Sequence, residues 1–110
     1  MRNALALIVL AAATSWMPRA SADPTDHVVT IRDFSYKPSD LTIQVGEKVQ
    51  FVNKDDVAHT VTAKDGSFDS KELDSNATWT YTFSTAGTYT YVCTYHPNMV
   101  GTITVKAPSQ

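Results

Sequence analysis

Three residues near the C-terminal end of the chain carry side chains that bind soft metal ions. Cys93, His96 and Met99 supply a thiol, an imidazole and a thioether at a spacing of three and three. Cys93 is the only cysteine of the chain, and Met99 is the only methionine after residue 22. Thiolate and thioether groups suit Cu(I), and imidazole suits copper more generally. The spacing therefore indicates a copper site built largely from one short segment.

A thiolate, two imidazoles and a weakly bound thioether form the ligand set of a blue-copper site. The second imidazole of such a site could come from His59 or His27. His59 opens a predicted strand after residues 48–53, whereas His27 lies near the expected start of the mature chain, where termini are usually mobile. A single Cys or Met is most often a packing residue, so the argument depends on the combination. We predict one copper ion per chain, bound by the four residues His59, Cys93, His96 and Met99.

The first 22 residues have the pattern of an export signal. A short basic start is followed by an apolar run over residues 4–13 and by Ala20-Ser21-Ala22, a small-x-small cleavage site. The apolar run is about half of the roughly 20 residues that a membrane-spanning helix needs. We therefore expect a signal peptide over residues 1–22, and a periplasmic domain over residues 23–110 that does not insert into the membrane.

The expected mature chain is long enough for one small domain. Removing Arg2 and Arg19 from the 9 basic residues leaves 7 against 11 acidic ones, a formal charge of −4. This balance does not predict nucleic-acid binding. With one cysteine, no internal disulfide can form. We expect a monomer.

Alternation of apolar and polar residues indicates an all-β fold, and no segment of useful length has helical periodicity. Gly46-Glu47 is expected to join two of the strands, 41–45 and 48–53, into a hairpin. The alternation over residues 88–93 places Tyr89, Tyr91 and Cys93 on one face, which directs the thiol inward. Short strands separated by turns predict a β-sandwich, with strands at 27–32, 41–45, 48–53, 59–63, 78–83, 88–93 and 101–105.

The segments 87–93 and 99–105, with the Cys-x-x-His-x-x-Met loop between them, resemble the small blue-copper proteins, or cupredoxins, of the plastocyanin, pseudoazurin and amicyanin group. The loop has the length found in amicyanins, so the resemblance is closest to these. It implies a Greek-key β-sandwich of about seven to eight strands, with His59, Cys93 and His96 as strong ligands and Met99 as the weak axial one. Asn53, six residues before His59, matches the Asn that bridges the two ligand-bearing segments in the family.

The resemblance also implies a function, that of a one-electron carrier cycling between Cu(II) and Cu(I) and not an enzyme. Its partners would be redox proteins that dock around His96, such as a periplasmic dehydrogenase, a reductase or a c-type cytochrome. Tyr95, Asn98 and Ala58 stand where amicyanins usually have Phe or Pro. The docking surface is therefore less apolar, and we do not carry over methylamine dehydrogenase, the partner of amicyanins.

Other functions are compatible with parts of this pattern. A periplasmic protein that stores or delivers copper would use the same soft donors, but it must release the metal readily. A structural zinc site would use Cys and His but not Met99. A Cys93–His96 catalytic pair lacks the signatures of cysteine hydrolases. A dinuclear copper centre would need a second cysteine, which the chain does not have.

Overall fold

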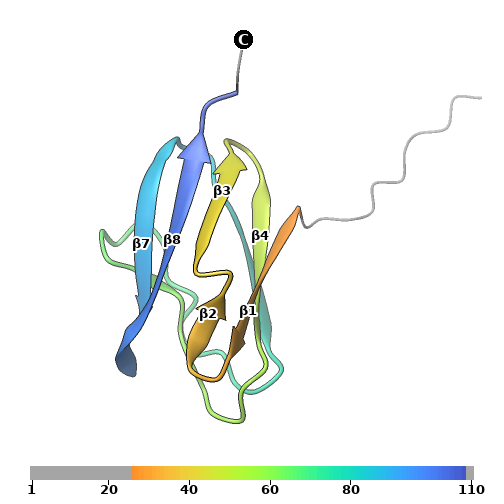
Figure 1. The fold of residues 1–110 in the computed structure, drawn as a ribbon, viewed down its shortest axis with the longest axis vertical. Coiled ribbons are helices and arrows are strands. Elements are labelled where there is room, and N and C mark those ends of the chain that lie inside the picture. The colour runs from red at the N-terminus through yellow and green to blue at the C-terminus, as the bar shows by residue number, and fades with distance from the viewer. Residues whose placement is uncertain (1–25, 109–110) are drawn as a thin grey trace, which may run out of the picture.

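The computed structural model describes residues 26–108, and this part of the chain folds into eight β-strands (Figure 1). The signal peptide predicted for residues 1–22 lies outside the described residues. Within 26–108 there is no helix long and apolar enough to cross a membrane. The strands are β1 (His27–Arg32), β2 (Ser35–Lys37), β3 (Asp40–Gln44), β4 (Lys48–Asn53), β5 (Thr62–Ala63), β6 (Thr78–Thr82), β7 (Gly87–Cys93) and β8 (His96–Lys106).

The strands form two sheets of four that pack face to face. One sheet has the order β2-β1-β4-β6 and the other β3-β8-β7-β5. The β1–β4 and β3–β8 pairs are parallel, and the remaining pairs are antiparallel. The prediction of an all-β sandwich of seven to eight strands is confirmed.

The core lies between the sheets and is formed by alternate residues of the facing strands. In β4, Val49 and Phe51 are fully buried, and in β7 Tyr91 and Cys93 are fully buried, as the alternation over residues 88–93 predicted. Such alternation follows from the two-residue repeat of a strand, which directs successive side chains to opposite faces. The inward direction of the Cys93 thiol is therefore a consequence of the register of β7.

The predicted hairpin between 41–45 and 48–53 was wrong. β3 pairs with β8, whereas β4 pairs with β1 and β6, so the two segments belong to different sheets. Gly46 makes the turn with φ = 93°, a value that favours glycine. Its N–H donates to the carbonyl of Phe83 at 2.7 Å, and Val45 N–H donates to the carbonyl of Lys106 at 3.0 Å. A turn signal shows where the chain reverses but not which strand becomes the neighbour.

The largest differences from the predicted strands lie at one end of the sandwich, and the other boundaries differ by at most a single residue. β2 was not predicted and follows β1 after a two-residue turn. The segment predicted as strand 59–63 contributes only Thr62–Ala63, while His59 forms an isolated bridge with Leu73. β8 begins at His96 and so takes in residues predicted as loop. The β1–β2 and β7–β8 turns both lie at the lower end in Figure 1.

Candidate metal centre

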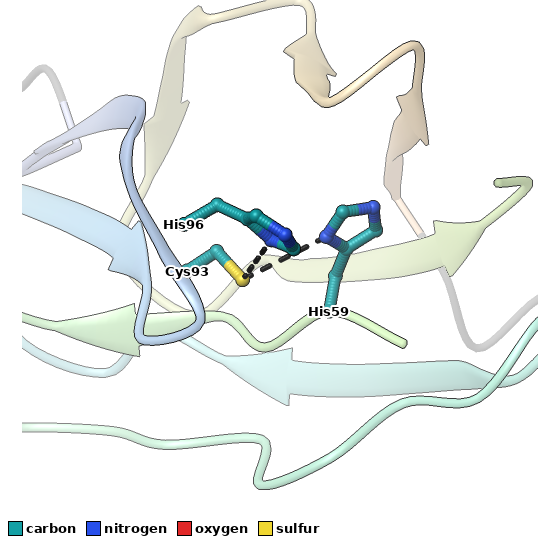
Figure 2. A group of neighbouring side chains, drawn as sticks. All are labelled: His59, Cys93 and His96. Carbon is teal, nitrogen blue, oxygen red and sulfur yellow. Dashed lines mark hydrogen bonds between the residues drawn. The ribbon is translucent and has the colours of Figure 1, made fainter. Parts of the chain in front are cut away.

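Three of the four predicted ligands come together at this end of the sandwich. The candidate donor atoms of His59, Cys93 and His96 all lie within 4.8 Å of one another. Sγ of Cys93 lies 3.7 Å from Nδ1 of His59 and 3.7 Å from Nδ1 of His96 (Figure 2). His59 and Cys93 are fully buried and His96 is partly exposed. A soft thiolate and two imidazoles converging in this way can bind a transition metal ion.

Cys93 and His96 are placed by the tight connection between β7 and β8. Cys93 is the last residue of β7 and His96 the first of β8, and the two are paired across a register shift. The prediction that His96 lies in the middle of a loop was therefore wrong, because only Thr94 and Tyr95 separate the strands. The backbone pairing at this point holds both donors close together.

His59 is held on a segment that runs beside the end of the sheet. Its N–H donates to the carbonyl of Leu73 at 3.1 Å, and Leu73 N–H donates to the carbonyl of His59 at 2.8 Å. These two bonds join the segment to the polar stretch 64–76, whose composition makes it the likeliest loop of the chain. The loop thus anchors a buried imidazole.

Asp55 contacts the side of the His59 ring that faces away from Cys93. Oδ2 of Asp55 lies 2.8 Å from Nε2 of His59. A carboxylate at this position accepts the Nε2 proton and leaves Nδ1 unprotonated, the state that a metal ligand requires. Burial by itself raises the pKa of Asp55, but hydrogen bonds from the backbone N–H groups of Phe34 and Asp33 and from His59 outweigh it, so the pKa of Asp55 lies below 3.8.

Thr60 links the segment of His59 to that of Cys93. Its backbone N–H points to Sγ of Cys93 at 3.4 Å, and its hydroxyl oxygen accepts the N–H of Thr94 at 2.9 Å. Hydrogen bonds to a ligand sulphur stabilise the thiolate and tune the metal that it binds. Thr60 was not predicted as a site residue, although its position directly after His59 was a usable signal.

Asn53 is fully buried, and its side chain organises the turn that leads to His59. Its Nδ2 donates to the carbonyls of Val57 and Leu73, both at 2.9 Å, and its Oδ1 accepts the N–H of Asp55 at 2.9 Å. Asn53 therefore supports the segment that carries His59 and Asp55. The side-chain partners of Asn53 all lie outside the Cys93 segment, whereas Thr60 bonds directly to Cys93 and Thr94.

Met99 is the fourth predicted ligand, and His27 is the alternative source of the second imidazole. Met99 is 4% exposed and belongs to the inward-facing residues of β8, three positions after His96. His27 lies at the far end of β1, where its Nε2 is 3.0 Å from Oε1 of Glu47. In the parallel register His27 pairs with Val49, whereas the site follows the other end of β4. The choice of His59 over His27 agrees with this geometry.

The surface around His96 combines aromatic and acidic side chains. Phe34, whose ring packs against His96, is 49% exposed, and Tyr95, which directly precedes His96, is 50% exposed. The phenol of Tyr95 donates to Oε1 of Glu72 at 2.9 Å, and this bond is the main reason that the pKa of Tyr95 is raised. Exposed apolar groups gathered near a binding site are typical of interaction surfaces.

Comparisons with known proteins agree with the fold and the site. Residues 4–105 match the model of the cupredoxin-like domain family. An amicyanin from Paracoccus versutus is 37% identical over 100 residues, which cover 84% of this chain and 76% of the relative. A plastocyanin from Dryopteris crassirhizoma is 30% identical over 69% of this chain and 92% of the relative.

Solved structures give the same result. A purple cupredoxin from Nitrosopumilus maritimus superposes with a TM-score of 0.69 at 29% identity, covering 74% of this chain and all of that protein. A Cu(I) form of an amicyanin variant superposes with a TM-score of 0.70 at 29% identity, covering 77% of this chain and 85% of that protein.

Proposed function

Because the chain belongs to the cupredoxin-like family, we propose that it is a periplasmic blue-copper protein that carries single electrons between partner proteins. The observation that carries the proposal is the convergence of His59, Cys93 and His96, whose donor atoms lie within 4.8 Å of one another. We further propose that residues 1–22 are an export signal and that residues 23–110 form the mature domain.

The proposed copper ligands are Nδ1 of His59, Sγ of Cys93, Nδ1 of His96 and the thioether of Met99. This set of one thiolate, two imidazoles and a weak thioether is the one found in blue-copper sites. Bound copper supplies one-electron chemistry by changing between Cu(II) and Cu(I). The sequence spacing and the burial of Met99 at 4% support its inclusion.

The protein's own contribution is to keep the ligands in one arrangement. Thr60 N–H is directed at the Cys93 sulphur, and the Asp55 carboxylate fixes the protonation of His59. Full burial of His59 and Cys93 excludes water from that side of the site. Ligands held by a rigid framework move little when the charge of the metal changes, which favours fast electron exchange.

Electrons would enter and leave through His96, the partly exposed imidazole. The partners proposed are a dehydrogenase, a reductase or a c-type cytochrome that docks around His96, on the surface containing Phe34 and Tyr95. The formal charge of −4 of the mature chain would favour partners with a basic docking surface by long-range steering.

Copper delivery is the competing function, and the two make different demands on the site. A delivery protein releases its metal to an acceptor, whereas a carrier retains it through many cycles of oxidation and reduction. Copper-loaded protein should therefore keep its metal through repeated cycles in the presence of a copper chelator. Complete loss of copper within a few cycles would favour delivery.

The most direct test is the visible and spin-resonance spectrum of the copper-loaded mature protein. We expect an intense blue colour from charge transfer between the Cys93 thiolate and Cu(II). Cys93→Ser should remove the colour while the domain still folds, because a serine fills nearly the same space. A colourless wild-type Cu(II) complex, or a blue Cys93→Ser variant, would overturn the site assignment and with it the proposed function.

A further inference from the structure

The turn between β1 and β2 has an unusual backbone conformation close to the metal centre. Arg32 pairs with Ser35, so only Asp33 and Phe34 form the turn. Both have positive φ, 55° at Asp33 and 57° at Phe34. Two-residue hairpin turns of this kind favour Asn-Gly or Asp-Gly, because a side chain at the second position is strained. A phenylalanine there requires contacts that hold it in place.

The Asp55 carboxylate supplies these contacts. Its Oδ1 accepts the N–H of Asp33 at 2.6 Å, and its Oδ2 accepts the N–H of Phe34 at 2.9 Å. Successive backbone N–H groups of a turn form a concave site that suits an anion. The same Oδ2 lies 2.8 Å from Nε2 of His59. One side chain, 11% exposed, therefore fastens the turn to a proposed copper ligand.

The ring of Phe34 completes the connection. Its centroid lies 5.1 Å from that of His59, with an angle of 87° between the ring planes, and 4.9 Å from that of His96, with an angle of 89°. The two imidazole centroids are 5.2 Å apart. Edge-to-face contacts of this geometry are favourable. Phe34 thus packs against both imidazoles at once and limits the rotation of each ring.

We propose that Asp55 and Phe34 act together as a clamp on the metal centre. Asp55 holds His59 and the strained turn in place. The turn then positions the Phe34 ring against His59 and His96. This inference rests on the proposed function in taking both imidazoles as copper ligands. Asp55 and Phe34 are positioning residues, since both act on the metal through the histidines.

The clamp affects the two oxidation states of copper unequally. A carboxylate that accepts the far N–H of a ligand imidazole increases the basicity of that ligand and places a negative charge near the metal. This charge stabilises Cu(II) more than Cu(I), because the electrostatic attraction grows with the charge of the ion. Asp55 should therefore lower the reduction potential, an effect that a purely structural role would not produce.

Asp55→Asn is the main test variant, and Asp56→Asn is its matched control. The two substitutions remove the same charge at adjacent positions, but Asp56 is exposed and is not part of the clamp. An asparagine at position 55 retains one acceptor for the turn but cannot satisfy all three donors. We expect Asp55→Asn to weaken Cu(II) binding about 10- to 100-fold. If Cu(I) binding were unchanged, each tenfold loss would raise the potential by about 59 mV.

A second set of measurements, on the metal-free protein, tests the clamp independently of the proposed function. In the wild type, NMR should show a slowly exchanging His59 Nε2 proton and imidazole proton shifts displaced by the Phe34 ring. Asp55→Asn should lose the protected proton. Phe34→Leu, which keeps an apolar side chain and leaves Asp55 in place, should retain that proton but change the shifts of both imidazoles.

These outcomes separate the two hypotheses. If Asp55→Asn and Asp56→Asn have the same potential and the same His59 proton exchange, or if Phe34→Leu leaves both imidazole shifts unchanged, the clamp is refuted. A wild-type protein that shows the protected proton and the ring shifts but no blue Cu(II) complex would support the clamp and refute the proposed function.

Discussion

The hydroxyl oxygen of Thr60 accepts a hydrogen bond from the backbone N–H of Thr94 at 2.9 Å. Thr60 directly follows His59, and Thr94 directly follows Cys93. This bond therefore sets the spacing of the two segments that bring the imidazole and the thiol together. Because Thr60 N–H also points to the Cys93 sulphur, Thr60 joins the two segments through both its backbone and its side chain.

Thr60→Val should loosen this spacing. Valine keeps the β-branched shape but cannot accept the Thr94 N–H, so we expect a loss of about 1 kcal/mol in the unfolding free energy of the metal-free protein. The charge-transfer band of the copper-loaded variant should also shift. Thr90→Val is the control, since Thr90 lies on β7, is partly buried, and makes no side-chain hydrogen bond within residues 26–108. Equal effects of the two substitutions on the spectrum would refute the spacing role.

Gly101 is required by the packing of Tyr91. The two residues face each other across the β7–β8 pair, and a Cβ atom at position 101 would overlap the Tyr91 phenol. Tyr91 is fully buried, so its ring cannot move aside without disturbing the core. Gly101→Ala should therefore destabilise the fold by about 1–3 kcal/mol in chemical unfolding.

The same substitution should also affect the metal centre. Tyr91 packs edge-on against Tyr36 at 4.7 Å, and the Tyr36 phenol donates to the carbonyl of Thr60 at 2.6 Å. Burial is the main reason that the pKa of Tyr36 is raised, so this phenol remains a donor. A displaced Tyr91 would shift Tyr36 and, through its hydrogen bond, the backbone at Thr60, and would thereby change the spectrum of bound copper. Gly101→Ala with wild-type stability and spectrum would contradict the packing argument.

Much of the fold could be predicted from patterns of residue types, because these patterns lie within short segments of the sequence. The strands β1 (His27–Arg32) and β4 (Lys48–Asn53) have the predicted bounds, and Cys93 and His96, singled out by their spacing, lie close together in the structure. In each case the signal is contained in a few consecutive residues, either a two-residue alternation or a fixed ligand spacing.

Pairings between distant segments could not be predicted in this way. The partner of β3 is β8, some sixty positions later, and nothing within residues 41–45 specifies it. Asp55 and Phe34 were missed for the same reason, since their contacts join separate parts of the chain. The position of Asp55 four residues before His59 was one usable local signal, since a carboxylate commonly orients a metal-binding imidazole.

Glu47 should make the fold sensitive to acid. Its Oε1 accepts the N–H of Gln44 at 2.8 Å and lies 3.0 Å from Nε2 of His27. The bond from Gln44, followed by that from His27, lowers the pKa of Glu47 below 4.5. A group whose pKa is lower in the folded state stabilises the fold above its unfolded pKa, and this stability is lost as the pH falls through the folded value.

Glu47→Gln is the corresponding variant. The wild type should be more stable than Glu47→Gln at pH 7, and the difference should shrink as the pH falls below about 4.5. Asp56→Asn controls for the loss of one negative charge elsewhere on the surface, since Asp56 is exposed. Measuring the unfolding free energy between pH 7 and pH 3 tests the prediction. A stability difference that stays constant over this range would show that Glu47 does not titrate with folding.

Electron exchange between two copies of the protein tests the proposed docking surface without a natural partner. The partly exposed His96 is followed on β8 by the exposed residues Pro97 and Asn98. Electron transfer requires the two metal centres to approach closely, so a bulky side chain beside His96 should slow it. Asn98→Trp should reduce the self-exchange rate several-fold, as measured by NMR line broadening in mixtures of oxidised and reduced protein, with the blue spectrum unchanged.

Val28→Trp is the matched control for this experiment. Val28 is 48% exposed but lies near the start of β1, at the opposite end of the strand from the turn that contacts the imidazoles. The same increase in size there should leave the self-exchange rate at the wild-type value. Slowing by both variants would point to a general effect of surface tryptophans. An unchanged rate in Asn98→Trp would place the electron-transfer surface elsewhere, since added bulk beside His96 would then not separate the two copper centres.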